Sequence, residues 1–80
     1  MIPPLPLPGR YRHYKGKEYE VLMTAYRAGN LDAIVVYQAL YTDPELGDKP
    51  IFWRPLEEFT QTVEHEGKHV PRFLFLKAKK

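Results

Sequence analysis

AIVVYQALY, residues Ala33–Tyr41, is the most strand-like segment of this chain. It is rich in β-branched and aromatic residues and contains no glycine or proline, which is typical of a β-strand. Successive side chains of a strand point to opposite faces, and here both faces are mostly apolar. The polar Gln38 indicates which face is more exposed to solvent. We therefore expect this segment to lie near the middle of a sheet that curls around it.

The length and composition describe one small domain with an ordinary surface. With 80 residues, of which 44% are hydrophobic and 14% aromatic, the chain has material for a single dense core. There is no cysteine, so disulfides and thiolate metal ligands are excluded, in keeping with a reducing compartment. No apolar run approaches the ~20 residues that span a bilayer, and prolines interrupt the N-terminal segment where a signal peptide would be apolar. We expect a cytoplasmic protein with no membrane partner.

Alternating apolar and polar residues predict further strands, separated by turn-forming segments. The predicted strands are Arg10–Tyr14, Glu18–Ala28, Ala33–Tyr41, Ile51–Arg54, Thr60–His65 and His69–Leu76. The connections are Lys15–Lys17, Gly29–Asp32, Thr42–Pro50 and Glu66–Lys68. The third is longer than a hairpin needs, which makes it a candidate part of a binding surface. The predicted fold is all-β, a small five-stranded barrel with one short helical turn.

The helical turn is predicted at Pro55–Phe59, sequence PLEEF, with proline at its first position and two glutamates in its opening turn. The alternation within the strands predicts the core. In the second strand, the inward side is expected to be Tyr19, Val21, Met23 and Ala25. The residues expected to be mostly buried are Val21, Val35, Tyr37, Trp53, Phe59, Phe73 and Phe75.

A proline-rich extended lead-in, residues 1–9, precedes the barrel domain, residues 10–76, and a basic tail, residues 77–80, follows it. The lead-in contains IPPLPLPG, whose four prolines favour a polyproline conformation. Its Pro3–Pro6 segment matches the PxxP pattern of ligands for aromatic-lined grooves. Because that pattern is short and common, we favour the alternative, a stiff segment lying along the domain's own surface. The tail is expected to fray.

Several separated motifs agree in order and spacing with one known family. They are YRHYKGKEYEVL (Tyr11–Leu22), VVYQALY (Val35–Tyr41), FWRPLEEF (Phe52–Phe59) and GKHVPRF (Gly67–Phe73). Together they resemble the short bacterial family known as domain of unknown function 1653. The resemblance implies a strongly bent sheet like a Src-homology-3-type barrel, and it implies no catalytic residues because the family has no established activity. The extra residues DPELGDKP indicate a longer loop than the family usually has.

The sequence HEGKH, His65–His69, matches the literal HExxH pattern of zinc metalloproteases. That chemistry needs a helix, because only there do residues four apart place both imidazoles on one face toward the metal. Gly67 within the motif and Pro71 just after it favour a turn between two strands instead. Two histidines facing each other across a hairpin could hold a metal adventitiously, but no third ligand is apparent. We expect no metal site here and a structural role for His13.

The usual catalytic groups are missing. The chain has no serine and no cysteine, so the common acyl-transfer nucleophiles are absent. Glu57 and Glu58 are adjacent, so on a helical turn they point about 100° apart and do not form an acid–base pair. No glycine-rich phosphate-binding motif occurs. We expect a protein that is not an enzyme and binds no cofactor.

Six tyrosines and one tryptophan are too many for so small a core to hide, so some must lie near the surface. Beside arginines, such rings suit the stacked bases and phosphates of RNA or another single-stranded nucleic acid. The candidate ligand-binding residues are Arg10, Arg12, Tyr14, Tyr41 and Arg54, with Arg27 and Arg72 as further arginines.

The same groove suits a peptide, so a protein or peptide interaction module is the alternative. A third interpretation makes the tyrosines barrel-wall residues and the arginines solvated strand residues. The net charge of +2 does not decide between them, and we place nucleic acid slightly ahead of peptide.

Overall fold

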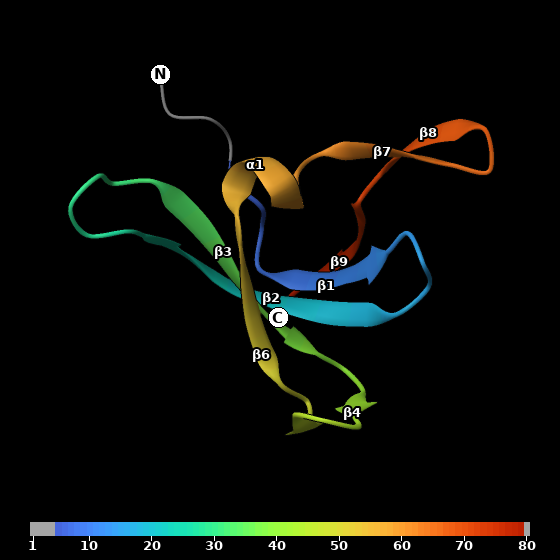
Figure 1. The fold of residues 1–80 in the computed structure, drawn as a ribbon, viewed down its shortest axis with the longest axis horizontal. Coiled ribbons are helices and arrows are strands. Elements are labelled where there is room, and N and C mark those ends of the chain that lie inside the picture. The colour runs from blue at the N-terminus through green and yellow to red at the C-terminus, as the bar shows by residue number, and fades with distance from the viewer. Residues whose placement is uncertain (1–4, 80) are drawn as a thin grey trace.

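A computed structural model describes residues 5–79, and most of them lie in β-strands (Figure 1). Five strands form one antiparallel sheet in the order β6-β3-β2-β1-β9. Their bounds are β1 Gly9–His13, β2 Glu18–Tyr26, β3 Ala33–Ala39, β6 Ile51–Pro55 and β9 Phe73–Ala78. The remaining elements within residues 5–79 are the hairpin β4 (Thr42–Asp43) and β5 (Gly47–Asp48), the short helix α1 (Leu56–Phe59), and the hairpin β7 (Thr62–His65) and β8 (Lys68–Pro71).

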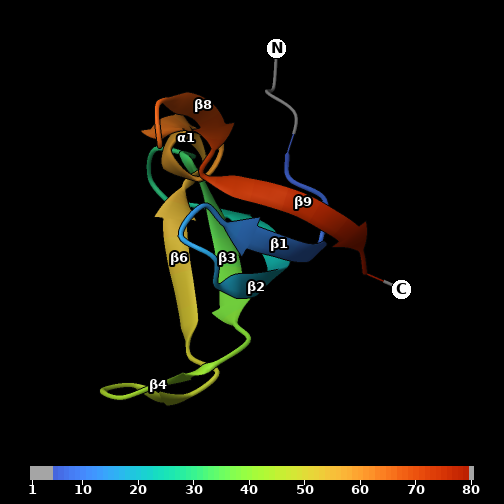
Figure 2. The same ribbon diagram turned by 90° about the vertical axis from the view of Figure 1, so that its right-hand side faces the viewer.

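The sheet confirms the predicted fold class of a mostly-β domain with one helical turn. β3 has strands on both sides, β2 and β6, as its two apolar faces predicted. The sheet is strongly bent, and in Figure 2 β1 and β9 run crosswise to β3 and β6. It does not close into a barrel among the described residues, because β6 and β9 are its two edges and no ladder joins them. Within residues 5–79, no helix is long and apolar enough to cross a membrane.

The core fills the concave face of the bent sheet beneath α1. Its buried members are Tyr11, Val21, Val35, Tyr37, Leu56, Phe59 and Phe73. Five of the seven residues predicted to be buried are confirmed, whereas Trp53 and Phe75 are 62% and 43% exposed. Trp53 pairs with Val36 on the outer face of the sheet, because its neighbours on β6 are the ones that point inward. Phe75 lies on an edge strand, so only one side of its ring is covered, by Tyr11.

A bulge in β2 changes which of its residues face the core. Val21 pairs with Tyr37, but Met23 already pairs with Val36, so Leu22 is an extra residue in the ladder. After such an insertion the alternation reverses, and Met23 lies on the outer face, 55% exposed. The prediction that Met23 and Ala25 follow Val21 into the core is therefore wrong. A period of two identifies the two faces of a strand only while no residue is inserted.

α1 forms where PLEEF was predicted, but Pro55 is its N-cap residue and Leu56 its first helical residue. Leu56 and Phe59 are buried, and Glu57 and Glu58 lie in the first turn, where carboxylates are favourable. Thr60 ends the helix, since its backbone N–H and its Oγ1 both donate to the carbonyl of Leu56.

HEGKH forms the turn of the β7–β8 hairpin, as predicted. Glu66 and Gly67 have φ of 52° and 77°, the left-handed values that a two-residue hairpin turn uses. In the ladder His65 pairs with Lys68, and His69 pairs with Glu64, so the two imidazoles lie on opposite faces of the hairpin. The expected long last strand is divided in two. After Pro71 the chain leaves the hairpin, and β9 pairs with β1 instead.

Both ends of the described chain pack against the sheet. Tyr11 Oη donates to the carbonyl of Leu7 at 2.8 Å, so this part of the lead-in lies along the domain's own surface. Pro3 and Pro4 of the PxxP segment lie outside the described residues. At the other end, β9 continues through Lys77 and Ala78, so the prediction that a fraying tail begins at residue 77 is wrong for these two residues. Gly9 makes this close approach possible, because a Cβ there would lie 2.3 Å from the carbonyl oxygen of Lys77.

Candidate ligand-binding site

Two arginines, Arg54 and Arg72, reach the same region beside α1 from different parts of the chain. Arg54 lies on β6 opposite Val35, whose side chain is fully buried, so the strand directs Arg54 toward the concave face. Arg72 lies between β8 and β9. Its N–H donates to the carbonyl of Gln61, and its carbonyl accepts the N–H of Tyr14, both at 2.9 Å. We call Arg54 and Arg72 the arginine pair.

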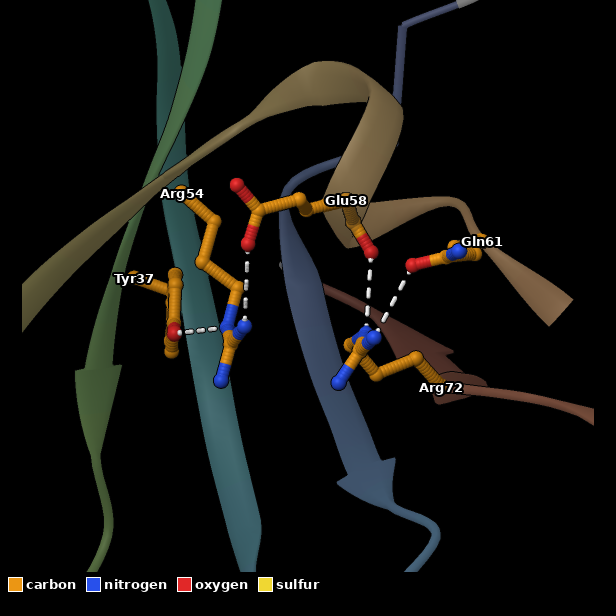
Figure 3. Close-up of polar contacts among 5 residues, drawn as sticks. All are labelled: Tyr37, Arg54, Glu58, Gln61 and Arg72. Carbon is orange, nitrogen blue, oxygen red and sulfur yellow. Dashed lines mark hydrogen bonds and ion pairs between the residues drawn. The ribbon is translucent and has the colours of Figure 1, made fainter. Parts of the chain in front are cut away.

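The side chains of the arginine pair are held by hydrogen bonds to Tyr37 on β3 and to Glu58 and Gln61 in and just after α1 (Figure 3). Arg54 Nε donates to Tyr37 Oη at 2.8 Å, and its Nη1 lies 3.5 Å from Glu58 Oε1. Arg72 Nε donates to the backbone carbonyl of Glu58 at 3.1 Å, and its Nη2 donates to Gln61 Oε1 at 2.9 Å. Glu58 thus contacts both arginines, one through its carboxylate and the other through its backbone.

Each guanidinium keeps one nitrogen without a hydrogen bond to the described residues, Nη2 of Arg54 and Nη1 of Arg72. In Figure 3 both of these nitrogens lie on the side away from α1. An ionised donor pairs best with a carboxylate or phosphate oxygen, and arginine presents its donors in a fixed fork. The arrangement therefore offers two oriented cationic donors on one side of the helix.

Half-buried aromatic rings continue from the arginine pair across the concave face. The Arg54 guanidinium lies 5.9 Å from the centre of the Phe73 ring, which itself contacts the rings of His13 and Tyr19. Beyond these, the Oη atoms of Tyr19 and Tyr41 are 2.7 Å apart. We call four of the half-buried rings the aromatic surface: His13, Tyr14, Tyr19 and Tyr41.

The charge of the arginine pair acts on this surface. Burial lowers the pKa of His13, and the nearby guanidiniums of Arg54 and Arg72 and the Lys15 ammonium lower it further. Burial also raises the pKa of Tyr37, although the hydrogen bond from Arg54 opposes this rise. Tyr19 has a raised pKa through burial and through its bond with Tyr41. The region thus combines positive charge with neutral hydroxyl groups.

The structure separates the five predicted ligand-binding residues into two groups. Arg54, Tyr14 and Tyr41 belong to the arginine pair and the aromatic surface. Arg10 and Arg12 lie on the outer face of β1, because Tyr11 and His13 occupy its inner face. Both contact Glu18, at 3.9 and 3.2 Å. The five residues therefore do not form one site, and Arg10 and Arg12 do not belong with Arg54.

In the sequence Arg72 is only one further arginine, and no pattern there predicts Glu58 or Gln61 as its partners. One local signal was present, since Arg54 and Glu58 are four residues apart around a predicted helical turn. Nothing local connects Arg72 to Arg54, because the contact depends on how the β7–β8 hairpin returns to the sheet. Among the described residues, no group of three or more histidine, aspartate or glutamate side chains is placed to hold a metal ion.

These features define a small antiparallel β domain whose concave face carries an arginine pair beside aromatic rings. The chain belongs to the family described as "Protein of unknown function (DUF1653)", which it matches over residues 9–75. It is similar to a crystal structure of a DUF1653 protein from Bordetella bronchiseptica, with 34% sequence identity and a TM-score of 0.78. That similarity covers 91% of this chain and 90% of the other. No curated protein matches the chain.

Proposed function

We propose that this chain is a non-catalytic binding domain for single-stranded nucleic acid, RNA foremost. The observation that carries the proposal is the arginine pair, whose two unbonded nitrogens lie on one side, next to the aromatic surface. Single-stranded ligands present phosphates and unstacked bases in alternation, so a site for them needs oriented cations and exposed ring faces together.

The phosphate contact is assigned to the arginine pair. Each arginine is held by two hydrogen bonds within the domain, so less side-chain freedom is lost when a phosphate binds. Glu58 neutralises part of the charge of Arg54. This partial neutralisation favours moderate affinity, in keeping with the net charge of +2.

The base contact is assigned to Tyr14 and Tyr41, both half-buried. Each has a lysine ammonium near its ring, Lys15 at 5.8 Å from the centre of Tyr14 and Lys17 at 4.2 Å from the centre of Tyr41. A cation over an aromatic ring also places a positive charge near the phosphate that adjoins a stacked base.

The test is fluorescence anisotropy with a labelled single-stranded RNA, run at several salt concentrations. Log affinity should fall with log salt, by about 0.7 for each phosphate neutralised. Arg72→Gln should weaken binding and reduce that slope. Arg12→Gln is the matched control, because it removes the same charge from the outer face, and it should change affinity little. Equal losses for both variants, or no binding at about 50 mM salt and ~100 μM protein, would contradict the proposal.

The alternative is a protein or peptide interaction module, which the exposed apolar residues on the outer face around Trp53 favour. A peptide bound mainly through apolar contacts would show weak salt dependence and would be insensitive to Arg72→Gln.

A further inference from the structure

The outer face of the sheet carries an uncharged, mostly apolar area over β2, β3 and β6, in which Gln38, opposite Ile51, is the polar residue. Met23, Val36 and Trp53 are direct cross-strand neighbours, and Ala25, Ile34 and Pro55 form the next row. We call this area the Trp53 face, comprising Met23, Ala25, Ile34, Val36, Ile51, Trp53 and Pro55. Its three largest exposed side chains are Trp53, Ile51 and Met23, which are 62%, 60% and 55% exposed. Contiguous apolar area of this kind usually marks an interaction site.

A groove of ≈ 1020 Å³ adjoins the Trp53 face where β6 meets α1. Trp53 and Ile34 line it from the face, and Tyr26 and Leu31 line it from the β2–β3 hairpin. Leu31 is 73% exposed and has a φ of 62°, a left-handed conformation that leucine rarely adopts. Its backbone closes the β2–β3 hairpin, since its N–H donates to the carbonyl of Arg27 at 2.8 Å, but packing within one copy of the chain does not cover its side chain.

The geometry favours contact through the face of the sheet rather than through its edge. β6 is an edge strand, but Pro50 precedes it and Pro55 ends it. Prolines at both ends protect a strand edge from pairing with another chain. An apolar sheet face packs instead against another apolar sheet face.

The charges beside the groove indicate what kind of partner fits. Arg27, Asp32 and Glu57 line it and are exposed, and none of the three forms an ion pair with another described residue. A surface that carries unpaired charges of both signs can pair with a second copy of itself across a two-fold axis, so that the cation of each copy meets an anion of the other. A purely basic or purely acidic partner would leave charges of one sign unmatched.

We propose that the chain forms a symmetric homodimer through the Trp53 face, with Arg27 of each copy beside Glu57 of the other. The proposal is independent of the nucleic-acid site. Trp53 and Arg54 are consecutive on β6 and therefore point to opposite faces, so the arginine pair stays open in the dimer.

Trp53 is the single tryptophan, so its fluorescence reports directly on this face. Light scattering and tryptophan emission are measured together at protein concentrations from roughly 1 μM to 1 mM. This range covers the dissociation constants of weak to moderate dimers. The mass should rise from 9.4 kDa toward twice that value. The emission maximum should move to shorter wavelength over the same concentrations, because dimerisation removes Trp53 from water.

Charge variants test the arrangement. Met23→Glu should raise the dimer dissociation constant about 100-fold or more, because it places an unpaired charge in the contact. Arg27→Glu and Glu57→Arg should each weaken the dimer, whereas the double variant should recover much of the loss. Leu74→Glu is the matched control, since Leu74 is 50% exposed on β9, away from the Trp53 face, and its variant should dimerise as the parent does. Circular dichroism checks that every variant is folded.

Two results would overturn the proposal. One is a mass that stays at 9.4 kDa with long-wavelength emission at every concentration. The other is a dimer whose emission does not shift and which tolerates Met23→Glu, because its contact would then lie elsewhere. Neither result affects the RNA-binding test, which is read from Arg72→Gln.

Discussion

The rings of Phe59 and Phe73 stack with their centres 4.2 Å apart and their planes 6° from parallel. Phe59 is the last residue of α1, and Phe73 is the first residue of β9 and directly follows Arg72. The stack therefore holds α1 against β9, the strand that begins directly after Arg72. Core packing and the candidate site depend on the same contact.

Phe73→Ala should lower the free energy of unfolding by roughly 3 to 5 kcal/mol, because it removes a buried ring that touches Phe59 of α1 and two tyrosines, Tyr19 and Tyr37. That is a large part of the stability of a small domain. Urea unfolding followed by circular dichroism measures the loss. Phe75→Ala is the control and should cost clearly less, because Phe75 is 43% exposed. Equal costs would show that β9 has a different register.

Tyr37→Phe should lower stability by less than Phe73→Ala does and should weaken RNA binding. The hydroxyl accepts a hydrogen bond from Arg54 Nε, and a bond to a charged group contributes about 1.5 to 3 kcal/mol at most. Without it, Arg54 loses one of the two contacts that orient its guanidinium. Affinity for the labelled RNA and the thermal midpoint are measured in parallel. A loss of stability with unchanged affinity would show that Tyr37 does not position Arg54 for binding.

Tyr41→Ala should cost ~1 to 3 kcal/mol of RNA-binding free energy and leave the salt slope nearly unchanged, since a stacked base releases no counterions. Tyr14→Ala should behave in the same way. Arg72→Gln should instead reduce the slope. Anisotropy titrations at several salt concentrations separate the two signatures. A reduced slope for Tyr41→Ala would argue against stacking.

Stability should fall as the pH drops from above 6.5 through the lower pKa of folded His13. In this window the unfolded chain binds a proton at His13 that the folded chain does not, so stability rises with pH. Burial and the charges of Arg54, Arg72 and Lys15 all lower that pKa. His13→Gln should flatten the dependence, measured as the urea midpoint against pH. His69→Gln, which alters an exposed histidine, serves as the control and should retain the slope of the parent.

Zinc and chelators should leave the thermal midpoint unchanged. His65 and His69 lie on opposite faces of a hairpin, so they do not converge on one ion as they would on a helix. Calorimetry with and without added zinc measures the midpoint. Stoichiometric zinc that survives dialysis against a weak chelator, and that His65→Ala removes, would show that the HEGKH turn does bind metal.

Local sequence patterns are sufficient to predict most of the secondary structure. The apolar run at Ala33–Ala39, the turn at Gly67 and the helical turn after Pro55 each depend on residues close in sequence, so propensity and spacing predict them. The candidate site was predicted less completely. Residue type makes Tyr14, Tyr41 and Arg54 candidates, but it does not predict their side-chain partners.

The sequence by itself determined that the chain is β-rich, where most strands and turns lie, and that HEGKH is a turn. Only the tertiary structure decided which side of each strand meets the core. The bulge at Leu22 reverses the alternation of β2, and the pairing of β6 turns Trp53 outward and Arg54 inward. It also decided that Arg72 stands beside Arg54, because β9 pairs with β1 and returns the chain to α1. The two-residue period of a strand determines which side chains share a face, but long-range strand pairing determines which of the two faces meets the core.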